Sequence, residues 1–228
     1  MRPEQLAEGI FRISERLPGV AEEFAVYFIN DGEGAIIEPG PASIANAVQE
    51  AADYLGIKQP KYIIPTHIHL DHAGGVGDIA QQFPNVKIAV HKRGAGHIVK
   101  PDMLIEGTRQ AYGKNFETDY GPISPVPKPQ ALPVDEGDVI RVGTRELKIM
   151  YTPGHAPHHI SVYDSRSQGI FSGDSLGFGM MGNNSVIIVA GFDLEYALDS
   201  IDRMQALNPK RIYAAHGTAE REPGEFIK

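Results

Sequence analysis

The sequence has no cysteine and no long apolar run. Without cysteine there are no disulfide bonds, no thiolate metal ligands and no cysteine nucleophile, so a metal ion would need histidine and carboxylate ligands. No apolar stretch approaches the roughly 18 to 20 residues that span a bilayer. The first residues, 1–5, are not followed by an apolar signal-peptide core. We therefore expect no membrane association and a cytoplasmic location.

Positive charge is also scarce, with 21 lysines and arginines against 29 acidic residues and a formal net charge of -8. Such a surface repels phosphate backbones unless a basic patch is present. The basic residues are scattered singly or in pairs such as Lys92-Arg93. We therefore expect no nucleic-acid partner and a small-molecule substrate, and a homo-oligomer stays open.

The length and composition are typical of one globular domain. A chain of 228 residues with 42% hydrophobic residues can bury a substantial core. We therefore expect a single domain over residues 1–228. Within it, the regular pattern weakens over residues 101–133, where five prolines interrupt it, and this segment is the candidate lid or insertion. The prolines are Pro122, Pro125, Pro127, Pro129 and Pro133.

Apolar periodicity predicts strands and helices in mixed order. Alternating or clustered apolar residues separated by turn residues predict hairpin-linked strands at the start of the chain, and a 3.6-residue period predicts helices. The expected strands are 9–14, 24–30, 35–38, 62–64, 86–90, 139–142, 146–151, 160–163, 169–171 and 211–214. The expected helices begin near residues 44, 75 and 194.

Titratable residues are concentrated directly after the expected strand 62–64. Three of the nine histidines lie between His67 and His72, together with Asp71. Burying so many titratable groups in a packed core is costly, whereas a metal ion would use them as ligands. In an extended segment, residues two apart point the same way, so His67 and His69 can chelate one ion. Asp71 and His72 follow closely enough to hold a second.

The run from His67 to His72 matches the His-x-His-x-Asp-His motif of the metallo-β-lactamase fold superfamily, which the chain resembles. Three later motifs of that superfamily follow in the same order, so the resemblance covers roughly residues 9–217. They are Thr152-Pro153-Gly154-His155, Ser172-Gly173-Asp174 and Ala215-His216-Gly217.

The resemblance implies two divalent metal ions, with zinc as the first candidate and iron or manganese as alternatives. It implies that a hydroxide between the ions is the nucleophile. Asp71 would be catalytic, because it would orient this hydroxide and pass a proton towards the leaving group. The implied ligands are His67, His69 and His155 for the first ion and Asp71, His72 and His216 for the second, with Asp174 bridging the two.

The segment 152–163 is most similar to that of hydroxyacylglutathione hydrolases (glyoxalase II) and lactonases. The expected function is therefore a metallo-hydrolase that cleaves a carbonyl ester, thioester or lactone of a small molecule. His159 matches a second histidine of thioesterase-like members, and we expect it to orient a ligand or the turn. The alternatives are a non-heme iron oxidoreductase similar to persulfide dioxygenases, a cysteine-free β-lactamase and a phosphodiesterase.

The resemblance also implies a fold. The early strands are linked as hairpins and the alternation of strands and helices is not strictly βαβ, which argues against a doubly wound parallel sheet. We therefore expect an α+β, four-layer αββα sandwich, with the metals at one edge of the two sheets.

Overall fold

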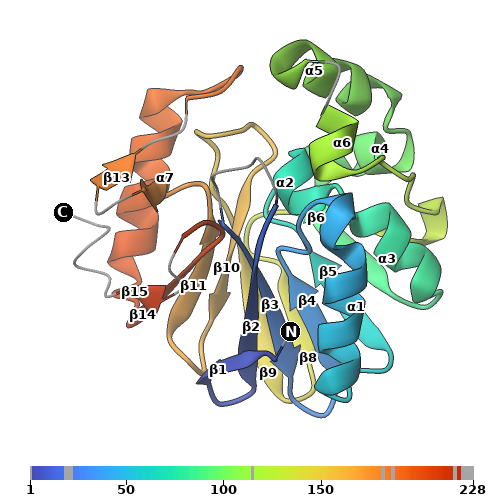
Figure 1. The fold of residues 1–228 in the computed structure, drawn as a ribbon. Coiled ribbons are helices and arrows are strands. Elements are labelled where there is room, and N and C mark those ends of the chain that lie inside the picture. The colour runs from blue at the N-terminus through green and yellow to red at the C-terminus, as the bar shows by residue number, and fades with distance from the viewer. Residues whose placement is uncertain are drawn as a thin grey trace.

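The computed structural model describes residues 2–17, 23–113, 116–180, 183–185, 188–217 and 220–221. These residues form two β-sheets that pack face to face, with helices on the outer side of each (Figure 1). The expected α+β, four-layer αββα sandwich is therefore confirmed.

The first sheet contains seven strands in the order in which they occur along the chain. Neighbouring strands are antiparallel from β1 to β4 and parallel from β4 to β7. The strands are β1 (Glu4–Ala7), β2 (Ile10–Arg16), β3 (Glu23–Asn30), β4 (Gly34–Ile37), β5 (Pro60–Ile64), β6 (Lys87–His91) and β7 (Ala131–Val134).

The second sheet has the strand order β15-β14-β11-β10-β9-β8. All its neighbours are antiparallel except β11 and β14, which are parallel. Its strands are β8 (Val139–Val142), β9 (Arg145–Tyr151), β10 (Ile160–Asp164), β11 (Gly169–Gly173), β14 (Arg211–Ala214) and β15 (Glu220–Arg221). A separate antiparallel pair consists of β12 (Phe178–Met180) and β13 (Asn183–Ser185).

Most helices lie on the side of the first sheet, whereas α7 covers the second (Figure 1). With 13 residues, α7 is roughly 20 Å long, which is less than the thickness of a bilayer core. No helix in the described ranges has the length and apolar character that a membrane crossing requires. The helices are α1 (Ala45–Tyr54), α2 (Leu70–Ala73), α3 (Val76–Gln82), α4 (Lys92–Val99), α5 (Asp102–Tyr112), α6 (Phe116–Tyr120) and α7 (Leu194–Ala206), with 3-10 turns η1 (Ala42–Ile44) and η2 (Lys128–Gln130).

The core is divided into three layers by the two sheets. Along β3 the side chains alternate, so that Phe28 packs towards the helices while its neighbours Tyr27 and Ile29 pack between the sheets. On the far side, Met204 of α7 packs against Ile212 of β14. Because both faces of β3 are buried, this strand holds the helical layer and the second sheet in fixed positions.

The segment 101–133 is partly built into the core. Phe116 of α6 is buried, and Val126 is buried in the cluster between the first sheet and its helices. The last residues, 131–133, belong to β7, which extends the sheet beside β6. Only the part before β7 lies outside the sheet, and its role as a lid stays a prediction.

Candidate metal centre

The seven predicted ligands meet at one edge of the two sheets. They lie on the chain directly after β5, β9, β11 and β14, whose C-terminal ends share this edge. The structure brings all seven together as two groups, and within each group the ligand atoms lie within 4.8 Å of one another. The first group is His67, His69 and His155, and the second is Asp71, His72, Asp174 and His216.

The first group aims three imidazole nitrogens at one point. Nδ1 of His69 lies 2.8 Å from Nε2 of His67 and 3.1 Å from Nε2 of His155. Burial, reinforced by the neighbouring histidines, lowers the pKa of His67 well below its usual range. Burial, reinforced by His155 and His72, also lowers the pKa of His69 to about 4. These rings are therefore neutral. One proton can be shared in a hydrogen bond between only two of the three nitrogens at a time. A metal ion can accept the lone pairs of all three nitrogens, so the group fits a cation.

The second group combines imidazole and carboxylate donors. Oδ2 of Asp71 lies 3.2 Å from Nε2 of His72 and 3.3 Å from Nε2 of His216. Although burial favours the neutral ring, the nearby carboxylates of Asp71, Asp174 and Glu38 raise the pKa of His72 well above its usual value. Likewise, burial favours the neutral carboxyl of Asp71, but His72 and His216 hold its pKa well below its usual range. Two carboxylates and two imidazoles that converge in this way also fit a cation.

Asp174 lies between the two groups. Its Oδ2 is 3.4 Å from Nε2 of both His155 and His72, and its Oδ1 is 3.4 Å from Nε2 of His216. The Oδ1 atom is buried and makes no hydrogen bond to any residue that the structure describes. A buried carboxylate whose two oxygens face both groups has the position that a bridging ligand requires.

The backbone at Asp174 is held in place by its neighbours. Gly173 has a φ of +53°, and a Cβ atom there would lie 2.4 Å from Oγ1 of Thr66 and 2.6 Å from Nε2 of His159, so only glycine fits. The amide of Asp174 donates to Nε2 of His159 at 3.1 Å. The proton of His159 is therefore on Nδ1, which donates to Oγ1 of Thr152 at 2.8 Å. These contacts agree with the orienting role expected of His159, which stays a prediction.

Glu38 supports the second group, and the sequence reasoning gave it no role. It is 2% exposed; its Oε1 accepts the amide hydrogen of Thr66 at 2.9 Å and its Oε2 accepts a hydrogen bond from Nδ1 of His72. This contact leaves Nε2 of His72 facing the centre. Glu38 also has a φ of +55°, which is uncommon for a residue with a side chain. The sequence feature that could have indicated this role is an acidic residue at the end of an expected strand, followed by Pro39 and Gly40.

Removal of metal ions should destabilise the protein, because ions that bind only the folded state stabilise it by mass action. With free metal at about a thousand times its dissociation constant the gain is about 4 kcal/mol, which corresponds to roughly 10 °C in Tm for a chain of this length. Thermal unfolding with and without a chelator measures this difference. The control is the same chelator saturated with metal beforehand. Equal Tm values in all samples would show that the two groups hold no ion.

The two packed sheets, with seven converging histidine and aspartate side chains at one edge, define an αββα protein with a candidate metal centre. Residues 24–216 match the family model described as the metallo-beta-lactamase superfamily. The chain belongs to this superfamily. The match extends from β3 to His216 and so includes every predicted ligand.

Three similar proteins illustrate the range of the superfamily. The crystal structure of ST1585 from Sulfolobus tokodaii aligns with a TM-score of 0.74 at 25% identity, covering 89% of this chain and 77% of that one. The human acyl-coenzyme A thioesterase MBLAC2 is 26% identical over 75% of this chain. A hydroxyacylglutathione hydrolase from Crocosphaera subtropica is 25% identical over 89% of this chain. The chain spans 64% and 67% of the length of these two enzymes.

Proposed function

We propose that this protein is a metal-dependent hydrolase that cleaves a thioester of a small molecule, with carbonyl esters and lactones as the related alternatives. The observation that carries the proposal is the convergence of seven ligands in two groups that share Asp174. The similarity to an enzyme named acyl-coenzyme A thioesterase, together with that to a hydroxyacylglutathione hydrolase, favours the thioester. In this reaction water cleaves the C–S bond: its hydroxyl group goes to the acyl carbon and its hydrogen to the sulfur, which gives a carboxylic acid and a thiol.

In this proposal His67, His69 and His155 hold one divalent ion, Asp71, His72 and His216 hold the second, and Asp174 bridges them. When bound, such ions act as Lewis acids and make hydroxide available near neutral pH. Zinc is the first candidate because neutral imidazole and carboxylate are its ligands, and iron and manganese are the alternatives. A cytoplasmic location stays a prediction of the sequence.

Asp71 is the most solvent-exposed side chain of the second group. Its side chain is 21% exposed, whereas those of His72, Asp174 and His216 are 3% exposed or less. An ionised carboxylate at the open side can accept a hydrogen bond from the attacking water and so orient it towards the substrate. We assign Asp71 this catalytic role, together with transfer of a proton towards the leaving thiolate.

The test combines metal analysis with a substrate panel of thioesters, lactones, β-lactams and phosphodiesters. The expected result is about two equivalents of metal per chain, with thioester turnover above that of the other classes. One iron per chain together with oxygen consumption would instead support the persulfide dioxygenase-like oxidoreductase. Turnover confined to β-lactams or phosphodiesters would contradict the thioester proposal and support the corresponding alternative.

A further inference from the structure

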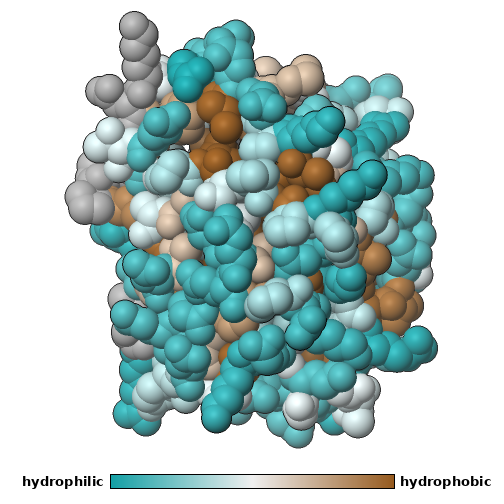
Figure 2. All heavy atoms as spheres, turned by 90° about the vertical axis from the view of Figure 1, so that its right-hand side faces the viewer, coloured by the Kyte–Doolittle hydropathy of each residue, from teal (hydrophilic) through white to brown (hydrophobic). Residues whose placement is uncertain are grey.

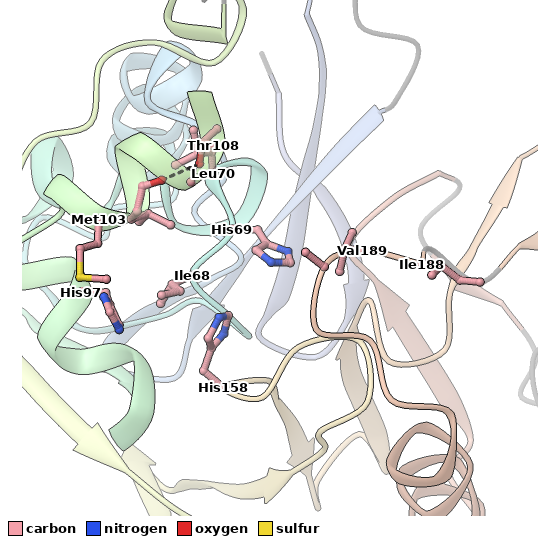
Figure 3. A pocket seen from close by; sticks show the side chains of 12 residues that line it. Ile68, His69, Leu70, His97, Met103, Thr108, His158, Ile188 and Val189 are labelled. Carbon is pink, nitrogen blue, oxygen red and sulfur yellow. Dashed lines mark hydrogen bonds between the residues drawn. The ribbon is translucent and has the colours of Figure 1, made fainter. Parts of the chain in front are cut away.

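A cavity of about 550 Å³ lies next to the candidate metal centre (Figure 3). This is within the usual range for small-molecule sites. One wall comes from α4, α5 and the residues after β5, and the opposite wall comes from residues 188–190 (Figure 3). The lining residues are Ile68, His69, Leu70, His97, Met103, Leu104, Gly107, Thr108, His158, Ile188, Val189 and Ala190.

The described walls of this cavity carry no carboxylate, ammonium or guanidinium group. None of the described residues that line it is Asp, Glu, Lys or Arg. The hydroxyl of Thr108 donates to the carbonyl oxygen of Leu104 at 2.9 Å, so its proton is already used. Since an unpaired charge is costly to bury, the cavity is suited to an uncharged, apolar group.

His69 connects the cavity to the metal centre. Its side chain lies between the two walls in Figure 3. Its Nδ1 atom, at 2.8 Å from Nε2 of His67, belongs to the first ligand group. A ligand that fills the cavity therefore has one end beside the ligands that would hold the first ion. This is where the reacting carbonyl of a substrate would have to lie.

Both walls leave large apolar side chains exposed. Met103 of α5 is 75% exposed, and Ile188 on the opposite wall is 76% exposed. In Figure 2 the main hydrophobic areas of the face lie towards its upper end, the end at which α5 lies in Figure 1, whereas the lower part is mostly hydrophilic. Apolar surface on both sides of a cavity is characteristic of a ligand-binding groove.

We propose that the acyl part of the substrate is an uncharged aliphatic chain of medium length, which lies in this cavity between α5 and residues 188–190, while the thiol part lies outside it. This inference rests on the proposed function for the nature of the scissile bond. The chemistry of the walls, and not the metal centre, selects the substrate. Acyl groups that carry a charge are excluded, and short ones leave the cavity unfilled.

Gly107 provides a direct test, because it lines the cavity and has open space where a side chain would begin. It lies on α5 among the lining residues, and a Cβ atom at this position would meet no atom within 4 Å. Gly96 on α4 is a matched control. A Cβ atom there also meets nothing within 4 Å, but Gly96 does not line the cavity. Since both are glycines inside helices, the same substitution has a similar effect on helix propensity at the two positions.

The experiment compares the native chain with Gly107→Phe and Gly96→Phe on acetyl, butyryl and octanoyl thioesters of N-acetylcysteamine, an uncharged thiol. For the native chain we expect kcat/KM to be about tenfold or more higher for octanoyl than for acetyl, because each buried methylene adds binding energy. Gly107→Phe should lose this preference, because octanoyl turnover falls towards that of acetyl, whereas Gly96→Phe should keep both the preference and the native acetyl rate. Unchanged chain-length preference in Gly107→Phe would overturn the proposal.

Calorimetric titration with octanoate separates this inference from the proposed function, since it needs no turnover. Binding to the native chain and to Gly96→Phe, but not to Gly107→Phe, supports the apolar acyl site even if no thioester is hydrolysed. Thioester hydrolysis without chain-length preference and without octanoate binding would overturn the acyl site and leave the hydrolase proposal standing.

Discussion

Replacement of Asp174 by alanine is expected to lower the hydrolytic rate by about a thousandfold or more, equivalent to ~4 kcal/mol or more in activation free energy. The reason is that its two oxygens contact histidines of both ligand groups at 3.4 Å, so its loss removes a ligand from each proposed ion. Metal content per chain and kcat/KM on the best thioester measure the effect together. Both should fall.

Two further variants show whether the effect belongs to the metal centre. Asp53→Ala changes an exposed aspartate on α1 and should leave metal content and rate unchanged. Asp174→Asn keeps the shape of the side chain and the backbone hydrogen bond to His159, but removes the negative charge. It should therefore fold normally and still lose metal. An Asp174→Ala protein with native activity would refute the two-metal mechanism.

Replacement of Glu38 by alanine is expected to weaken metal binding at the second group by about 10- to 100-fold. Glu38 accepts hydrogen bonds from Nδ1 of His72 and from the amide of Thr66, so the variant leaves both buried donors without their acceptor. His72 would no longer be held with Nε2 towards Asp71. Competition with a chromophoric chelator measures the affinity of each group.

The matched control for Glu38 is Glu50→Ala, which removes an exposed glutamate from α1. It should bind metal as the native chain does. In Glu38→Ala the ion at the first group should be affected less than the ion at the second, because Glu38 contacts none of its ligands in the described hydrogen bonds. Equal weakening of both ions would point to general unfolding, and unchanged affinities would contradict a supporting role for Glu38.

The sequence predicted which side chains meet at the candidate centre because they lie in short motifs at the ends of regular elements. The strands Val139–Val142 and Arg211–Ala214 have the predicted bounds, and their alternating or continuous apolar residues reflect burial on one or both faces. His67 and His69 were predicted from their spacing within a dense cluster of titratable residues. The distant ligands Asp174 and His216 were predicted only from the resemblance, since nothing local indicates which loops meet at one sheet edge.

Elements that depend on tertiary contacts were missed. Helix α4 contains Gly94 and Gly96, which lower helix propensity. Gly94 is required because a Cβ atom there would lie 2.8 Å from Cγ2 of Ile68. Strand β7 contains Pro133, which cannot donate to a ladder but is tolerated because β7 is the last strand of its sheet. The left-handed backbone of Glu38 likewise cannot be inferred from its neighbours in sequence.

The cavity walls and the metal ligands are carried by different parts of the chain. The ligands follow the ends of buried strands, whereas much of the lining is on α5 and on residues 188–190, outside both sheets. Sequence changes in these outer segments can therefore alter the accepted acyl group while the reaction chemistry is preserved. In evolutionary terms, relatives that keep these seven residues but differ in α5 and in residues 188–190 are expected to differ in the acyl group that they accept.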